Sequence, residues 1–255
     1  YNCEVPADVF YLTAGVDTQD DRLEVEVVGW GEGAESWGIQ YAIFYGDTKL
    51  KAVWDDLDAF LLQSFTRADG TQMKIICTCI DSGGHRANVV YKFCKARAAR
   101  HVYAIRGQGG ADVPYIKRPT RNNREQAYLF TLGVDTGKSI LLDRLKVELV
   151  DENGNDLDRA PGYCHFPKDK GRGYTEEYFK GLTAEHQVMT YKSGRPVFVW
   201  KIKDFAHKRN EALDCRNYAT AALEIRNPLL KKPDKAAPTA APRKGRRRRS
   251  SGGVI

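Results

Sequence analysis

The most constraining feature of the sequence is the nearly continuous apolar run KIICTCID at residues 74–81, which ends in an acid. A continuous apolar run of this length is typical of a strand that is buried on both faces and has a parallel neighbour. The sequence therefore predicts an α/β domain built around a central sheet. Asp81 then lies at the carboxyl end of a central strand, where functional groups gather in open sheets.

Strands are also predicted on the N-terminal side of this run. Residues 11–18 form a first strand that ends near Asp17, and residues 19–21 have the composition of a turn. Apolar and polar residues then alternate in residues 23–27 and again in 37–43, as in half-buried strands. The short connections between these strands predict an antiparallel meander, so the sheet should be mixed.

Helical spacing appears at residues 53–61 and again at residues 89–94. A further strand is predicted at 101–105. Residues 106–128 are rich in glycine and basic side chains and predict a long exposed loop, which in folded domains is usually functional or mobile.

The last third of the chain predicts a helix capped by Asp135 and running to residue 145, a helix over 175–186 and a strand near 197–202. A final helix is expected over 210–225, with Asn210 as its cap and Pro228 beyond its end. We therefore expect one domain over residues 1–227. Residues 228–255 are rich in Pro, Ala and Arg and are expected to be a disordered tail.

Charge and cysteine usage narrow the class of protein. The net charge is +7, but the segment after Pro228 carries +8, which leaves the rest of the chain at −1. Any nucleic-acid contact of the folded part must therefore come from local basic patches. The six cysteines form no CxxC pair and predict reduced thiols in a cytosolic protein. No apolar run reaches the roughly 20 residues that span a bilayer.

Three acids stand where a metal site would need them. Asp17 ends the first strand, Asp81 ends the buried strand and Asp214 lies on the final helix. If the two strands are neighbours, the carboxylates converge and repel one another unless cations neutralise them. Mg²⁺ or Mn²⁺ prefer such oxygen ligands, and two ions would suit the hydrolysis of a phosphodiester. Alternatively, Asp17 is a solvated turn residue and Asp214 is an ion-pair partner of Arg209 or Arg216.

Several segments together resemble the nuclease half of the large terminase subunit of lambda-like tailed bacteriophages, the terminase GpA family. These segments are residues 12–31, 77–85, 133–138, 162–167, 182–185 and 209–223. The resemblance extends over most of residues 10–226 and does not cover the tail.

The resemblance implies an RNase H-like fold and a two-metal DNA endonuclease in the host cytoplasm. It implies that Asp17 and Asp81 are the strand ligands and that Asp214 is the helix ligand. It also implies a packaging motor whose ATPase domain precedes this region, with double-stranded DNA, the portal protein and the small terminase subunit as partners. No membrane partner is expected.

Other side chains are secondary candidates for the site. Glu211 shares a helix face with Asp214 and is either a further ligand or a surface acid. His85 follows Asp81 closely and either assists proton transfer or only begins a helix. The segment GVDTGKS at 133–139 has one residue too few between its glycines for a phosphate-binding loop, so an ATPase is disfavoured.

Three basic clusters flank the predicted site and are candidates for DNA contact. They would bind phosphates and so position DNA without reading its sequence, although each alone is equally a solvated surface. The candidates are Arg106, Lys117, Arg118, Arg121 and Arg124 in the first cluster, Lys168, Lys170 and Arg172 in the second, and Lys201, Lys203, Lys208 and Arg209 in the third. The block at residues 246–249 is either a DNA-binding arm or a docking signal.

Two other functions remain open at this point. A transposase or junction resolvase would use a similar acid cluster on the same scaffold. A module that binds DNA or portal protein without cutting would have lost its metals.

Overall fold

The computed structural model describes residues 1–110, 113–151, 153–204 and 208–231. Its strands are β1 (Tyr11–Thr18), β2 (Arg22–Trp30), β3 (Ser36–Tyr45), β4 (Phe65–Thr66), β5 (Gln72–Met73), β6 (Ile75–Asp81), β7 (Val102–Gln108), β8 (Thr120–Arg121), β9 (Tyr128–Gly133), β10 (Cys164–His165), β11 (Glu185–Lys192) and β12 (Arg195–Ile202). Its helices are α1 (Lys51–Leu61), α2 (Ala87–Ala96), α3 (Val134–Arg144), α4 (Glu176–Leu182) and α5 (Glu211–Arg226), with short 3-10 turns at Glu32–Ala34, Ala98–Arg100 and Lys170–Arg172.

Eight strands form one mixed sheet in the order β10-β3-β2-β1-β6-β7-β9-β8. The first three strands along the chain form the predicted antiparallel meander. β1 then pairs in parallel with β6, β6 with β7 and β7 with β9. The apolar run at 74–81 is thus a central parallel strand, as its composition predicts, and it lies next to β1.

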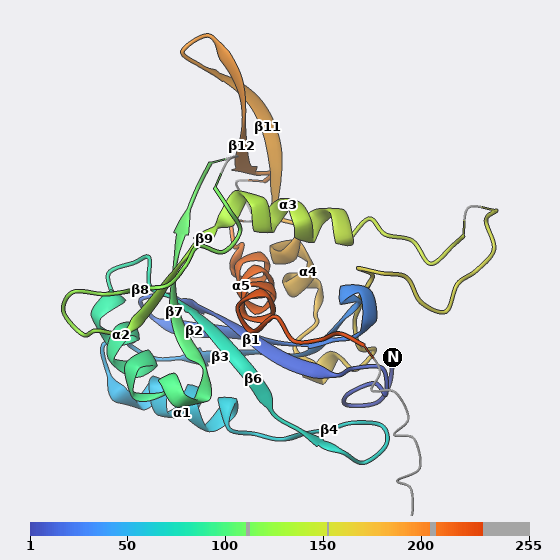
Figure 1. The fold of residues 1–255 in the computed structure, drawn as a ribbon, viewed down its shortest axis with the longest axis horizontal. Helices are drawn as coiled ribbons and strands as arrows, with labels where there is room; N and C mark the ends of the chain where they lie inside the picture. The colour runs from blue at the N-terminus through green and yellow to red at the C-terminus, as the bar shows by residue number, and fades with distance from the viewer. Residues whose placement is uncertain (111–112, 152, 205–207, 232–255) are drawn as a thin grey trace, which may run out of the picture.

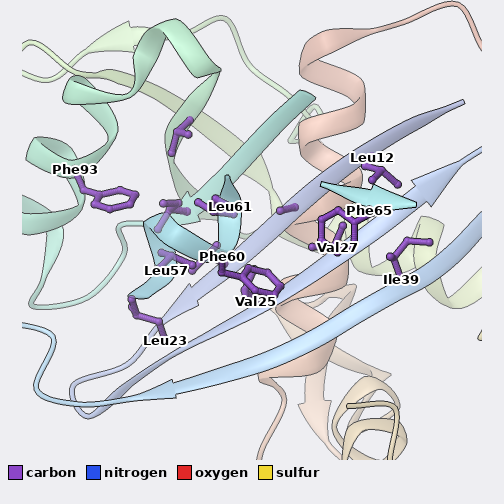
Figure 2. Packing of buried hydrophobic residues seen from close by; sticks show 14 of the residues in the cluster. Leu12, Leu23, Val25, Val27, Ile39, Leu57, Phe60, Leu61, Phe65 and Phe93 are labelled. Atoms are coloured by element: carbon purple, nitrogen blue, oxygen red, sulfur yellow. The ribbon is translucent and has the colours of Figure 1, made fainter. Parts of the chain in front are cut away.

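α1 and α2 cover one face of the sheet, and the largest hydrophobic core lies beneath them. Figure 2 shows this packing, in which Leu23 and Val25 of β2 meet Leu57 and Phe60 of α1. Burying a large apolar side chain of this kind contributes roughly 1.5–3 kcal/mol relative to leaving it exposed. This layer therefore fixes the sheet on which the acids stand.

α5 packs across the other face, against β1, β2 and β6, with α3 and α4 beside it (Figure 1). Gly15 of β1 allows this approach. A Cβ at Gly15 would lie 2.0 Å from the Cys215 carbonyl oxygen and 2.4 Å from the Ala219 nitrogen, which no side chain tolerates. The bare backbone at this position brings the helix directly onto the strand.

β11 and β12 form a separate two-stranded ribbon that projects beyond α3 (Figure 1). Ser193 and Gly194 form its two-residue turn with φ values of 51° and 75°. Positive φ at both positions is the signature of the type I′ turn, whose twist matches that of the paired strands.

Three expectations about the elements are wrong. The helix predicted over 175–186 ends at Leu182 because the chain continues as β11, where Glu185 is a buried strand residue. Asp135 lies inside the first turn of α3, which has no side-chain cap, and accepts a hydrogen bond from the Gly110 amide instead. Residues 106–128 are not one loop, since β7 extends to Gln108 and Thr120–Arg121 pair with β9.

The six cysteines are free thiols, and all except Cys3 are buried. None of the helices in the described ranges is long and apolar enough to cross a membrane. The tail predicted at 228–255 falls outside the described residues from position 232 onward.

Candidate active site

The parallel pairing of β1 and β6 places Asp17 beside Asp81. Val16 is the register partner of Ile80, so the next residue of each strand is an aspartate. The Thr18 hydroxyl also donates to the Asp81 carbonyl oxygen at 3.1 Å. Because paired strands lie about 4.8 Å apart, the two carboxylates start from adjacent backbone positions.

The same face of the sheet meets the first turn of α5, which carries Asp214. Gly15, two residues before Asp17, lies against the backbone of this helix. Cys79, two residues before Asp81, packs in one hydrophobic cluster with Tyr218 of the helix. The phenol of Tyr218, one turn beyond Asp214, is buried beside all three aspartates, and their negative charges add to the burial that raises the pKa of Tyr218. The structure therefore brings Asp17, Asp81 and Asp214 together.

Burial and mutual repulsion disfavour the charged state of these acids. Burial, followed by the charge of Asp214, raises the pKa of Asp17 well above its usual value, although Gln19 donates a hydrogen bond to its carboxylate at 2.5 Å. Burial also raises the pKa of Asp81, against the backbone amides of Gly83 and Ser82. The cluster thus has more negative charge than the surrounding protein neutralises.

Asp214 is held in a four-residue network with one cation. Burial raises the pKa of Asp214 to about 6, opposed by the nearby Lys138 ammonium. The Lys138 Nζ lies 3.6 Å from Asp214 and 2.7 Å from a Glu185 oxygen. Asn210 donates to both acids, at 2.7 Å to Glu185 and 3.1 Å to Asp214. The alternative ion pair of Asp214 with Arg209 or Arg216 is not what the structure shows.

Sequence reasoning missed Lys138 and Glu185. Lys138 belongs to the GVDTGKS segment, which was considered only as a phosphate-binding loop. Glu185 was placed at the end of a helix that does not extend so far. A signal was present, because both residues lie in short segments, 133–138 and 182–185, that carry the family resemblance.

Glu211 lies near the aspartates, but its carboxylate forms ion pairs with arginines. It forms ion pairs with Arg22 and Arg209, and both arginines also pair with Glu24, which is fully buried on β2. Its negative charge still contributes to the raised pKa of Asp17, so Glu211 lies near the cluster. In this arrangement Glu211 fastens the start of α5 to β2.

His85 is exposed in the turn between Asp81 and α2. It stands before the helix and not within it, since α2 begins at Ala87. Its position four residues after Asp81 keeps it at the same edge of the sheet as the aspartates.

The basic clusters are distributed unequally around this edge. Arg106 follows Ile105, the register partner of Asp81, and Lys117 donates to Gln108 at the end of β7. Arg121 instead stacks on Tyr128 at the start of β9, toward the other end of the sheet, and Arg124 follows in the same turn.

The second and third basic clusters also differ in their position relative to the edge of the sheet that carries the aspartates. Arg172 donates to the Glu4 carbonyl oxygen and lies beyond β3, with Lys168 and Lys170 beside it. Lys208 and Arg209 lie just before α5, and Arg209 pairs with Glu24 and Glu211. Arg118, of the first cluster, is exposed on the connection before β8.

Across the described ranges, no three His, Cys, Asp or Glu side chains are already arranged to hold a metal ion. Each of the three aspartates has a hydrogen-bond or ion-pair partner within the chain. Gln19 binds Asp17, the Gly83 amide binds Asp81 at 3.1 Å, and Lys138 and Asn210 bind Asp214.

Comparison with known proteins identifies the domain. Residues 1–233 match the family model described as "Terminase large subunit gpA, endonuclease domain". The chain belongs to this family. Related proteins include the large terminase subunits of Escherichia phage lambda, 37% identical over 225 residues, and Enterobacteria phage P21, 34% identical over 226 residues. Each alignment covers 88% of this chain but 34% of the relative, so the chain spans about a third of their length.

The fold is shared with a solved terminase domain. The nuclease domain of the large terminase subunit gp2 of bacterial virus Sf6 superposes with a TM-score of 0.50 at 14% identity, covering 82% of this chain and 87% of that one. The terminase nuclease family and the RNase H-like mixed sheet predicted from the sequence are both confirmed.

Proposed function

We propose that this terminase nuclease domain hydrolyses DNA phosphodiesters with two divalent cations, Mg²⁺ or Mn²⁺, held by Asp17, Asp81 and Asp214. The observation that carries the proposal is the excess of buried carboxylates at one edge of the sheet, with Lys138 as the cation paired among them. Buried acids without matching cations are destabilising, and their shifted pKa values are typical of functional sites.

The donor set fits hard divalent cations. Carboxylate oxygens are the ligands that Mg²⁺ and Mn²⁺ prefer, and the two strand aspartates and the helix aspartate approach from different elements. Bound ions would supply an activated water and neutralise the leaving oxygen. The chain's own contribution is to hold three acids close together and mostly out of water.

Neighbouring side chains orient these ligands. Gln19 positions the Asp17 carboxylate, and the Gly83 amide positions Asp81. Lys138 and Asn210 link Asp214 to Glu185. Bound cations would neutralise these acids, and Lys138 would then be released to meet a phosphate oxygen. Glu211 acts through its ion pairs with Arg22 and Arg209 by fixing the start of α5. We assign His85 a secondary role at the same edge, in proton transfer.

DNA would lie across this edge, where the nearest cations are Arg106, Lys117, Lys208 and Arg209. Contacts from Arg118, Arg121, Arg124, Lys168, Lys170 and Arg172 would be more distant and would bind flanking phosphates. Phosphate contacts of this kind fix the register of the duplex without specifying its sequence.

In the parent motor we propose that the domain cuts concatemeric viral DNA in the host cytoplasm. The partners would be double-stranded DNA, the portal protein and the small terminase subunit. The lambda and P21 relatives, named as large terminase subunits, support this assignment.

The decisive experiment is Asp81→Asn, assayed for nicking of supercoiled plasmid with Mn²⁺. We expect nicking to fall at least about a hundredfold because a direct metal ligand is lost, with the thermal melt unchanged or higher. The matched control is Asp55→Asn, which removes an exposed carboxylate of α1 and should leave nicking unchanged. Undiminished nicking by Asp81→Asn would exclude the mechanism.

Titration with Mn²⁺, followed by electron paramagnetic resonance, separates the remaining alternatives. Two bound ions in the wild-type chain and fewer in Asp81→Asn would support the proposal. A wild-type chain that binds no Mn²⁺ would instead be a module that binds DNA or portal protein without cutting.

A further inference from the structure

The ribbon of β11 and β12 begins inside the proposed active site and ends in solvent. Its first residue, Glu185, accepts hydrogen bonds from Lys138, and the remaining seven residues of β11 lead away beyond α3 (Figure 1). Eight residues of strand extend about 26 Å. A segment with this geometry can contact DNA beside the cut without being part of the catalytic cluster.

One face of the ribbon is apolar and aromatic. Met189 lies directly opposite Phe198, and Tyr191 lies opposite Pro196, so these four side chains share a face. Met189, Tyr191 and Phe198 are 54%, 68% and 62% exposed. An exposed strip of large apolar side chains on a projecting ribbon is typical of a binding surface.

The charge of the ribbon identifies the class of partner. Residues 186–203 contain Lys192, Arg195, Lys201 and Lys203 and no Asp or Glu. Lys192 and Arg195 face each other at the tip, and Lys201 lies near the base opposite His186. These positions alternate with those of the aromatic strip, so the cations lie on the opposite face of the ribbon. A basic ribbon with one aromatic face complements a polyanion that also presents flat apolar surfaces.

Polar groups line the inner end of the strip. A hollow of about 280 Å³ separates the ribbon from the start of α3 and is lined by Thr136, Ser139, Gln187, Phe198 and Trp200 together with Asp135. The buried indole N–H of Trp200 has no acceptor among the described residues. Hydroxyl, amide and indole groups of this kind can bond to the edge of a nucleobase.

We propose that the aromatic face of the ribbon binds unpaired nucleotides of the DNA next to the cleavage site. Tyr191 and Phe198 would stack on bases, and the long side chains of Lys192 and Arg195 at the tip would reach around the edge of the ribbon to phosphates. Stacking requires bases whose faces are free, so the ligand is a single-stranded segment and not an intact duplex. The inference rests on the proposed function only for the placement of the cut.

The reach of the ribbon sets the footprint. Met189 and Tyr191 lie four and six residues from Glu185, or about 13 and 20 Å along the strand. At roughly 3.4 Å per stacked nucleotide, the strip covers bases within about six positions of the scissile phosphate.

The test measures binding without cleavage. Fluorescence anisotropy in EDTA would compare a labelled 12-nucleotide single strand with its duplex, using the full chain. We expect the double variant Tyr191→Ser with Phe198→Ser to weaken single-strand binding by at least about tenfold and duplex binding by less than about twofold. Tyr191→Phe should bind as the wild type does, because the ring is kept.

Two controls make the result specific. Leu62→Ser removes an exposed apolar side chain at the end of α1 and should change neither affinity. A single strand that carries 2-aminopurine should lose fluorescence on binding the wild-type chain and keep it with the double variant. This quenching reports stacking, which a merely structural role of the two rings would not produce.

Three outcomes would overturn the proposal. If the double variant binds the single strand as tightly as the wild type does, the aromatic face does not bind DNA and would instead contact a protein. Equal losses for single strand and duplex would make the ribbon a general DNA contact. Weaker binding without 2-aminopurine quenching would exclude stacking. None of these results depends on cleavage, so failure of the nuclease proposal remains distinguishable.

Discussion

Two groups of buried or half-buried acids lie around the first turns of α5, and their charges are neutralised differently. We call them the arginine-paired set, which is Glu24, Glu26 and Glu211 with Arg22, Arg209 and Arg216, and the aspartate set, which is Asp17, Asp81, Asp214 and Glu185 with Lys138. In the first set each acid has at least one guanidinium partner. In the second, one ammonium lies between two of four acids.

The two sets differ in how far arginine or lysine partners balance their negative charge. Glu26 and Arg216 are both almost fully buried, and Tyr174 and Tyr178 also donate to the Glu26 carboxylate. In this network the two charges cancel, although Glu26 Oε2 and Arg216 Nε and Nη1 have no hydrogen-bond partner among the described residues. Asp17, by contrast, is 4% exposed and its ordinary partner is the neutral Gln19. Burial alone therefore does not identify a reactive site, whereas burial without a compensating cation does.

The largest expected effect is on stability in the arginine-paired set. Arg216→Ala should lower the free energy of unfolding by about 3–5 kcal/mol because it leaves Glu26 buried and unpaired. Urea denaturation measures this loss. Lys180→Ala, which breaks an exposed pair with Glu176, should change stability by less than about 1 kcal/mol. Equal effects of the two variants would contradict the distinction between the sets.

Divalent cations should stabilise the aspartate set. Mn²⁺ at a hundred times its dissociation constant should raise the free energy of unfolding by about 2.7 kcal/mol for each bound ion, since the ions bind the folded chain. The measurement is thermal melting with and without Mn²⁺. Asp81→Asn should abolish most of the shift, whereas Asp55→Asn should keep it. A full shift in Asp81→Asn would place the ions elsewhere.

Without divalent cations, stability should depend on pH through Asp214. Its pKa is raised from the usual 3.8 to about 6 in the folded chain, so the folded state binds more protons between these pH values. The free energy of unfolding should therefore fall as pH rises from about 4 to about 6, by on the order of 2 kcal/mol. Urea titrations in EDTA would measure it, and Asp214→Asn should make the profile less steep, while Asp17 and Asp81, whose pKa values are also raised, keep the remaining slope. A rise in stability over this range would refute the assignment.

The smallest expected effect is a gain. Asp17→Asn removes a buried negative charge and keeps an acceptor for Gln19, so it should raise the free energy of unfolding at pH 7.5 by about 1 kcal/mol in EDTA. Asp58→Asn is the matched comparison, because Asp58 pairs with Arg97 and Arg100 and its loss should destabilise the chain. The two variants should therefore shift the melting temperature in opposite directions.

Much of the sheet was predictable because its strands carry their own patterns. The alternation in residues 23–27 and the apolar run at 74–81 each predict a strand, and both strands are confirmed. The half-buried character predicted for residues 23–27 is wrong, because Glu24 and Glu26 are fully buried beneath α5, where arginines pair with them. The helix expected over 175–186 failed because the ribbon stands largely in solvent, so β11 has no simple alternation of buried and exposed residues. Its strand character depends on pairing with β12, which a local pattern does not reveal.

The convergence of Asp17, Asp81 and Asp214 was predicted from strand ends and one helix, and the register of β1 with β6 shows why that reasoning works. Lys138 and Glu185 were beyond its reach, since they meet only through the packing of α3, β11 and α5. Likewise, one of the two arginine partners of Glu211 is Arg22 on β2, 189 residues away. Partners of this kind are set by tertiary contact and leave no local signal.

Gly15 has a consequence for how such a site can vary. Gly15 lies two residues before Asp17, and because it has no Cβ, α5 can approach β1 closely. This approach sets the distance from Asp214 on the helix to Asp17 and Asp81 on the strands. Adding that carbon would lift α5 off β1 and carry Asp214 away from its companions while every acid stayed in the sequence. The distance between the three carboxylates therefore depends on Gly15, a residue that has no functional side chain.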